Sequence, residues 1–198
     1  MEFYSKKEQL IENIELKNHI KSGVSLNYYN DTIRDDKNIC LLAINCDSGN
    51  YKYVSQRLHD DRDIIIETIK KDGKIFQHIP NNFRDDKEIT LLAVKSYPYA
   101  IQYASHTLKH DRDVCLEVVK QKGELLEYIP IKDDKEIVLE AVKNNPKAMY
   151  YTTEDILLKY GTNHKILISN IEKELGIKSD ILKPNQTYQN LKKLIKDT

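Results

Sequence analysis

An aspartate followed by a basic residue recurs along the chain and is the first pattern that could carry chemistry. The copies are Asp36-Lys37, Asp61-Arg62, Asp86-Lys87, Asp111-Arg112 and Asp134-Lys135. A second aspartate precedes several copies, as Asp60, Asp85 and Asp133 do, and paired carboxylates can bind a divalent cation. An aspartate at a helix start has another role, because its side chain accepts a hydrogen bond from an N–H that the helix leaves unpaired. Since the pattern recurs in every copy whereas a metal site would be local, we interpret these aspartates as helix N-caps.

Acidic residues three positions further on extend this interpretation to a capping box, in which the two ends of the first turn bond reciprocally. The pairs at this spacing are Asp85 with Glu88, Asp133 with Glu136 and, with a shorter acid, Asp60 with Asp63. The basic residue after each aspartate can pair with the aspartate of the adjacent copy. An exposed ladder of such pairs adds little stability.

Tyrosines recur seventeen residues after the repeated aspartate, and a histidine, His78, takes this place in one copy. Such a row most often lines the seam between packed units, with the rings inward and the hydroxyls reaching water. Alternatively, it presents a stacking face for a peptide, a base or a sugar. The candidate binding residues are therefore Tyr53, Tyr103, Tyr128, Tyr151, Arg62 and Arg112.

Histidine and cysteine offer little catalytic chemistry in this sequence. His106 and His110 have the spacing of two metal ligands on one helical face, but His110 occupies a position that is aspartate in other copies. We expect His110 to begin the next helix and the two imidazoles to lie on different elements. Cys40 and Cys115 share one repeat position and are expected to be buried, whereas Cys46 is expected at the surface. No phosphate-binding glycine loop, nucleophile elbow or zinc-protease motif occurs, so we expect no catalytic residue, no metal and no cofactor.

The repeat predicts the elements that position these residues. The recurrent aspartates are 25, 25, 25 and 23 residues apart, and apolar residues follow each at helical offsets of 3, 5 and 8. Glycine or proline at offset 12 ends this first helix or begins a second short one. Helices of about ten residues are marginal alone, so they must pack on their neighbours. We predict an all-α fold, an α-solenoid of stacked two-helix repeats.

Alternate copies resemble each other more than adjacent copies do, which predicts modules of two repeats, about 50 residues long. Three regions follow: a degenerate N-terminal capping repeat over 1–35, the repeat array over 36–156, and a C-terminal helical cap over 157–198. The array begins new repeats at residues 36, 61, 86, 111 and 134. The degenerate copy keeps the register through Ile14, Leu16, Gly23, Leu26, Tyr28 and Ile33.

The C-terminal region is predicted to hold two helices. The first opens at Thr162 or Asn163 and runs through Glu174 to Gly176, and the second runs from about Thr187 to Ile195. Residues 159–198 carry eight lysines against four acids, which provides a local attraction for an acidic partner. A solvated capping face accounts for the same excess.

Composition restricts the functional class. The 198 residues include 31 basic and 31 acidic side chains, so no net charge favours nucleic acid or disorder. No apolar stretch approaches the ~20 residues of a membrane-spanning helix, and the first residues lack the apolar segment of a signal peptide. Three cysteines fit a reducing compartment better than a disulfide framework. We expect no membrane association and a cytoplasmic location, in the cell of origin or in a host cell.

One segment carries a resemblance to a known family. Its residues are Asp86-Lys87-Glu88-Ile89, Leu92-Ala93-Val94, Tyr103-Ala104-Ser105, Leu108 and Asp111-Arg112-Asp113. This pattern resembles the repeat family known as domain of unknown function 4116, over about residues 35–156. Ile79-Pro80 and Ile129-Pro130 depart from it, because that family more often has Ala-Ser there. The resemblance implies helical repeats, an origin in large DNA viruses, protists or intracellular bacteria, and no assigned activity or site residues.

Three functions are compatible with these observations. The first is a non-enzymatic interaction module that presents stacked helices to a protein partner, in a viral or effector-like role. The second is a nucleic-acid-associated protein that uses the lysine-rich C-terminal segment. The third is an effector or toxin with a cryptic enzymatic activity through Cys46 or the Asp and His clusters. We expect the first, because the repeat is strong and no catalytic constellation is present.

Overall fold

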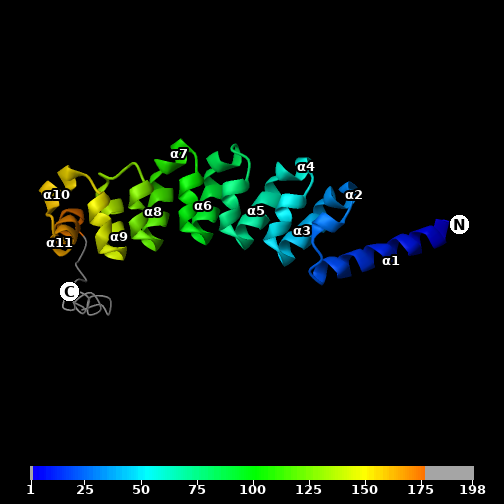
Figure 1. Cartoon of the computed structure of the whole chain (residues 1–198). Coiled ribbons are helices and arrows are strands. Elements are labelled where there is room, and N and C mark those ends of the chain that lie inside the picture. The colour runs from blue at the N-terminus through cyan, green and yellow to red at the C-terminus, as the bar shows by residue number, and fades with distance from the viewer. Residues whose placement is uncertain (1, 177–198) are drawn as a thin grey trace. The chain divides into compact units, whose positions relative to one another are not determined.

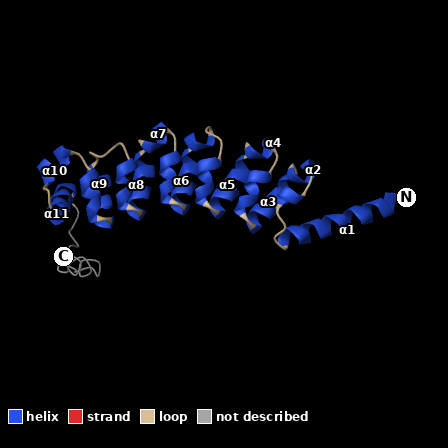
Figure 2. Ribbon diagram, viewed as in Figure 1, coloured by secondary structure: helices blue, strands red, loops and turns tan. Residues whose placement is uncertain are grey.

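Helices are the building blocks of the part of the chain that the computed structural model describes, residues 2–176 (Figure 1). No strand occurs among these residues (Figure 2). The chain divides into two compact units, residues 1–118 and 119–198, and each is described by itself. The repeated helices of the described residues confirm the predicted all-α class, and the solenoid layout stays a prediction. The region boundaries predicted after residues 35 and 156 stay predictions.

Each repeat opens with a ten-residue α-helix, as the spacing predicts. These helices are α3 (Lys37–Cys46), α5 (Arg62–Lys71), α6 (Lys87–Ser96), α8 (Arg112–Gln121) and α9 (Lys135–Asn144). The aliphatic residues at offsets 3 and 8 enter the core; in α5 these are Ile64 and Ile69, both fully buried. Burial of one such side chain contributes about 1.5–3 kcal/mol, which holds helices that are too short to persist alone.

An aspartate side chain caps the N-terminus of these helices. Asp61 Oδ1 accepts hydrogen bonds from the backbone N–H groups of Asp63 at 3.0 Å and Ile64 at 3.2 Å. The same position caps the other helices, through Asp36, Asp86, Asp111 and Asp134. Each cap satisfies donors that would otherwise lack a partner at the helix start.

The predicted capping boxes at Asp60, Asp85 and Asp133 are wrong, because the cap is the next residue along the chain. Glu88 therefore lies at the second helical position rather than the third. Its Oε2 accepts a hydrogen bond from Arg62 at 2.5 Å instead of reaching back to the cap.

A 3₁₀ helix, not a second α-helix, follows in each repeat. These helices are η2 (Ser48–Tyr53), η3 (Gly73–His78), η5 (Pro98–Tyr103), η6 (Gly123–Tyr128) and η7 (Pro146–Tyr151). Two repeats then add a single α-helical turn, α4 (Gln56–His59) and α7 (His106–Lys109). Extended backbone at Val54 and Ala104 separates the two pieces, so the predicted second helix is divided.

Serine and proline at one position explain the two-repeat module. Ser55 Oγ accepts a hydrogen bond from the Leu58 N–H at 3.4 Å and so caps α4, and Ser105 caps α7 in the same way. In the intervening repeat Pro80 stands at this position, and it has no hydroxyl that could cap a helix. A turn and the 3₁₀ helix η4 (Phe83–Asp85) follow Pro80 instead.

The N-terminal copy keeps the same order of elements: α1 (Glu2–Lys21), η1 (Leu26–Tyr28) and α2 (Asp31–Arg34). Leu26 is fully buried, as its place in the repeat predicts. Ile14 is 51% exposed, although its offset is a buried one in the other repeats. The opening helix is twice the length of those in the array.

Helices stack in sequence order within the first compact unit, where α1 packs on α3, α3 on α5 and α5 on α6. The close packing depends on Gly73, the first residue of η3. A Cβ atom there would lie 2.8 Å from the Ala93 carbonyl oxygen and 2.9 Å from Ser96 Cβ. Gly73 has no positive φ, so it is required for this approach and not as a helix stop.

In the second compact unit, α9 packs on η6, η7 and α11 (His164–Leu175), and α10 (Glu154–Tyr160) packs on α11. Asn163 caps α11 by accepting the Lys165 N–H at 3.0 Å, and Gly176 ends it with φ of +69°. This confirms the first predicted C-terminal helix. The second, over 187–195, lies outside the described residues. Within residues 2–176 no helix is both long and apolar enough to span a bilayer.

Candidate binding surface

A ladder of ion pairs links consecutive repeats in the first compact unit. Its rungs are Lys37 with Asp61 (2.9 Å) and Asp63 (2.6 Å), Arg62 with Asp86 (3.3 Å) and Glu88 (2.5 Å), and Lys87 with Asp111 (2.9 Å) and Asp113 (2.6 Å). Each cation therefore reaches the capping aspartate of the following repeat, as predicted. The capping aspartates thus serve both the helix end and the contact between repeats.

The ladder changes the ionisation of its members. Burial by itself raises the pKa of Asp61, but hydrogen bonds from Lys37 and from the Ile64 N–H outweigh it, and the pKa is lowered. Hydrogen bonds from Lys37 to Asp63 and Asp61 raise the pKa of the lysine. These groups stay charged throughout the physiological range, which suits a structural role.

The two arginines predicted as binding residues lie at this ladder position. Arg62 forms ion pairs with Asp86 and Glu88, so its charge is already matched within the chain. Arg112 is exposed at the start of α8 and also has an interaction partner. Their role in binding stays a prediction.

The predicted tyrosines all lie at the last residue of a 3₁₀ helix. In the first compact unit, Tyr53 is half-buried and Tyr103 is 39% exposed. In the second, Tyr128 is 42% exposed and Tyr151 is half-buried. We call Tyr53, His78 and Tyr103, the members in the first compact unit, the 3₁₀-end row. Their rings are neither fully buried between repeats nor fully exposed to solvent.

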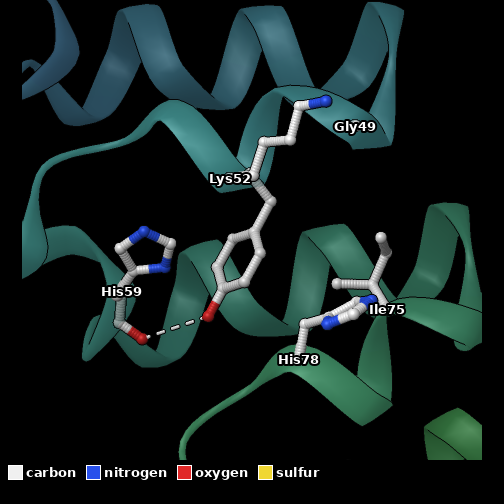
Figure 3. Close-up of a pocket in the computed structure, with 6 residues that line it drawn as sticks. Gly49, Lys52, His59, Ile75 and His78 are labelled. Carbon is white, nitrogen blue, oxygen red and sulfur yellow. Dashed lines mark hydrogen bonds between the residues drawn. The ribbon is translucent and has the colours of Figure 1, made fainter.

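A pocket of about 470 Å³ lies beside this row (Figure 3). Its lining residues are Gly49, Tyr51 and Lys52 of η2, His59 of α4, and Ile75 and His78 of η3. Two adjacent repeats therefore build it together. This volume is within the range of about 300–1,000 Å³ that is usual for ligand sites. No motif in the sequence predicted this pocket, although Gly49 in place of Tyr99 of the next module is a visible signal.

Tyr51 and His59 form the aromatic wall of the pocket. The Tyr51 hydroxyl donates a hydrogen bond to the His59 carbonyl at 3.3 Å, and the two rings meet edge to face at 4.7 Å. Burial and the nearby Asp60 raise the pKa of Tyr51 to about 12. Burial lowers the pKa of His59, so its imidazole is neutral at pH 7. The wall is therefore suited to packing against a planar group.

The histidine pair elsewhere in this unit differs from its prediction. His106 is the first residue of α7 and His110 is its C-cap, so both belong to one element, and their ring centroids are 4.3 Å apart. The expectation that His110 begins the next helix is wrong, because Asp111 is the cap of α8. Among the side chains of residues 12–176 no three of His, Cys, Asp or Glu gather as metal ligands.

The cysteines lie as predicted. Cys40 and Cys115 are fully buried, and Cys46 is exposed. Burial raises the pKa of the Cys40 thiol to about 12, which makes it unreactive at neutral pH.

Glu174 of α11 is the centre of a small hydrogen-bonded cluster near the C-terminal end of the described residues. It accepts hydrogen bonds from Lys135 Nζ at 2.6 Å, Tyr160 Oη at 2.6 Å and Lys159 Nζ at 3.3 Å. The contacts with Lys135 and Tyr160 lower the pKa of Glu174 to about 2. Lys159, one of the eight lysines behind the nucleic-acid alternative, is therefore paired, and the last five of those lysines lie outside the described residues.

An N-capped α-helix and a 3₁₀ helix, repeated in register, define a helical-repeat protein. The chain belongs to the family described as Domain of unknown function (DUF4116), whose model matches residues 36–84, 61–109, 86–132 and 111–157. Each match covers two consecutive repeats, and together they span the predicted array. No curated protein and no solved structure matches the chain.

Proposed function

We propose that the protein is a non-enzymatic interaction module that binds a segment of a partner protein along its 3₁₀ helices. The observation that carries this proposal is the 3₁₀-end row. Three successive repeats place Tyr53, His78 and Tyr103 at one register position, and none of these rings is fully buried. Partly exposed aromatic rings on a rigid scaffold are typical anchors of protein recognition.

The charge distribution at the α-helix starts also favours the 3₁₀ helices as the binding surface. The ladder residues at the α-helix starts are matched to each other, so they offer little unpaired charge to a partner. By contrast, the 3₁₀ helices carry the aromatic row and the adjacent pocket. A segment of a partner that lies across η2, η3 and η5 would contact equivalent side chains in successive repeats.

Selection of binding peptides tests this proposal. A displayed random-peptide library is selected on the wild-type protein, and the enriched peptides are titrated against a Tyr53→Ser/His78→Ser/Tyr103→Ser variant. We expect this variant to lose about tenfold or more in affinity, because aromatic anchors dominate such interfaces. Its circular dichroism and thermal midpoint report that the fold is retained.

A matched control changes three exposed residues near the ends of the opening helices, Asn45, Lys71 and Lys95, to serine. This control should keep wild-type affinity. Failure to enrich any peptide, or equal loss of affinity in both triple variants, would contradict the proposal.

A further inference from the structure

The pocket beside the 3₁₀-end row is lined in part by Gly49, which has no side chain. The backbone does not require glycine there, since Gly49 has no positive φ. Its N–H donates to Asp47 Oδ1 at 2.8 Å, and in the next repeat Lys74 makes the same bond to Asp72 Oδ1 at 2.9 Å. A residue with a long side chain therefore occupies this turn elsewhere in the chain. The backbone conformation at Gly49 therefore does not explain why a glycine is present.

The next two-repeat module has a tyrosine at the equivalent position. Tyr99 lies 50 residues after Gly49 in the same register, it is half-buried, and its ring lies 5.5 Å from that of Tyr97. At this position of the module the chain thus has an aromatic ring in one case and no side chain in the other. A planar aromatic group is the natural occupant of a site of this kind.

The lining of the pocket fits such a group. Tyr51, His59 and Ile75 provide aromatic and aliphatic walls, and His59 and His78 lie on opposite sides of the site (Figure 3). Tyr51 is 3% exposed and its hydroxyl is engaged with the His59 carbonyl, so it contributes only a small part of its ring to the lining.

The charge of the lining indicates what surrounds the aromatic group. Among the described residues that line the pocket, the exposed Lys52 is the one with a permanent charge, and none is an acid. Two acids lie next to the lining without being part of it: Asp47, which accepts from the Gly49 N–H at 2.8 Å, and Asp60, whose charge contributes to the raised pKa of Tyr51. A ligand with carboxylates next to its aromatic ring would therefore be complementary to the rim at Lys52.

We propose that this pocket binds one aromatic side chain of an acidic peptide segment in the partner protein. The inference rests on the proposed function and specifies its anchor. The neighbouring carboxylates of the peptide pair with Lys52, and the ring packs between the two histidines against Tyr51.

Fluorescence anisotropy with defined peptides tests the inference. The probe is a labelled Glu-Glu-Trp-Glu-Glu peptide, and the controls replace its Trp by Ala or its four Glu by Lys. We expect the wild type to bind the probe about tenfold or more tightly than either control. Ring-current shifts of the His59 and His78 imidazole protons on titration would place the ring in the pocket.

Two variants locate the binding. Gly49→Tyr copies the residue of the next module and fills the pocket, and it should weaken probe binding about tenfold or more. The atoms nearest to its Cβ all belong to the Asp47 side chain, the closest being Oδ1 at 3.1 Å, so the fold should persist. Lys52→Glu changes an exposed residue and should favour the lysine-containing peptide over the probe.

The outcomes separate this inference from the proposed function. Wild-type binding that Gly49→Tyr and Lys52→Glu both leave unchanged, or no binding of the probe at all, would overturn the pocket assignment. If library-selected peptides still depend on the 3₁₀-end row but ignore Gly49→Tyr, the interaction module stands and the aromatic anchor fails. If no peptide depends on either feature, both proposals fail.

Discussion

At the scale of single residues, one aspartate in each repeat serves two purposes. Asp61 bonds the first N–H groups of its own helix and also the lysine of the preceding repeat. The sequence pattern predicted both roles. It placed the capping box one residue early because two adjacent aspartates are equivalent candidates until the backbone turn is known.

Replacement of Asp61 tests the position of the cap. Asp61→Ala should lower the free energy of unfolding by about 1–2 kcal/mol, because it removes the cap and one ladder contact. Asp60→Ala is the matched control, since Asp60 follows α4 and does not cap α5. Urea denaturation should show a change of less than about 0.5 kcal/mol for this control. A larger loss of unfolding free energy for Asp60→Ala than for Asp61→Ala would support Asp60 as the cap and contradict this assignment.

Two glycines differ in how strongly the packing requires the absence of a side chain. Gly73→Ala should destabilise the protein by about 1–3 kcal/mol, because its Cβ would lie 2.8 Å from a backbone oxygen. Gly49→Ala should cost less, since the nearest atom belongs to the Asp47 side chain. Thermal unfolding of the two variants, side by side, measures this. Equal destabilisation would show that Gly49 is also needed for packing.

At the scale of elements, the first half of the repeat was predictable and the second was not. A capping aspartate and buried residues at offsets 3 and 8 define a ten-residue helix, and α5 matches this pattern. Over six residues the periods of an α-helix and a 3₁₀ helix differ too little to be told apart from sequence. The division between η2 and α4 depends on the extended backbone at Val54, which apolar spacing does not report.

The pocket was unpredictable for a related reason. Its walls come from two repeats, so it depends on how η2 and η3 approach each other. The sequence shows that Gly49 takes the position of Tyr99 in the next module, but a pocket can be recognised only with the neighbouring repeat in place. By contrast, burial of Cys40 followed directly from its register position.

An ion pair between a partly exposed lysine and a buried glutamate joins α9 and α11 in the second compact unit. Lys143 Nζ lies 2.6 Å from Glu172 Oε1, Glu172 is 3% exposed, and its other oxygen has no hydrogen-bond partner within the described residues. Lys143→Met should lower the free energy of unfolding by about 2–3 kcal/mol, because it leaves a buried carboxylate unpaired.

Two further variants check the cause. Lys143→Met combined with Glu172→Leu should recover part of the loss, since no unpaired charge remains. Lys173→Met, an exposed change on the same helix as Glu172, should be nearly neutral. A double variant that is less stable than Lys143→Met would show that the pair itself is net stabilising.

At the scale of the whole molecule, the ion pairs predict how stability depends on pH. The pKa values of Asp61, Asp111 and Glu174 are lowered in the folded protein, that of Glu174 to about 2. Their contribution is therefore present above the ordinary carboxyl pKa values and is lost as the pH falls through the lowered ones. We expect the thermal midpoint to decline between about pH 4.5 and pH 2.

Glu174→Gln isolates one part of this decline. The variant should be less stable than the wild type at pH 6 and should approach it near pH 2, where Glu174 is protonated in the wild type as well. Thermal melts across this range are the measurement. A constant difference between the two proteins at every pH would show that Glu174 contributes by packing and not by its charge.

The direction of the ladder has a consequence for how such a chain can change in length during evolution. Each rung runs from a cation in one repeat to carboxylates in the next, as from Lys37 to Asp61 and Asp63. A duplicated repeat thus brings a cation that pairs with the following repeat and acids that pair with the preceding one. The ion pairs can therefore form at both new boundaries between repeats. Gene duplication can therefore lengthen the array without first evolving a new contact, and the added copies are then free to diverge at surface positions such as that of Gly49.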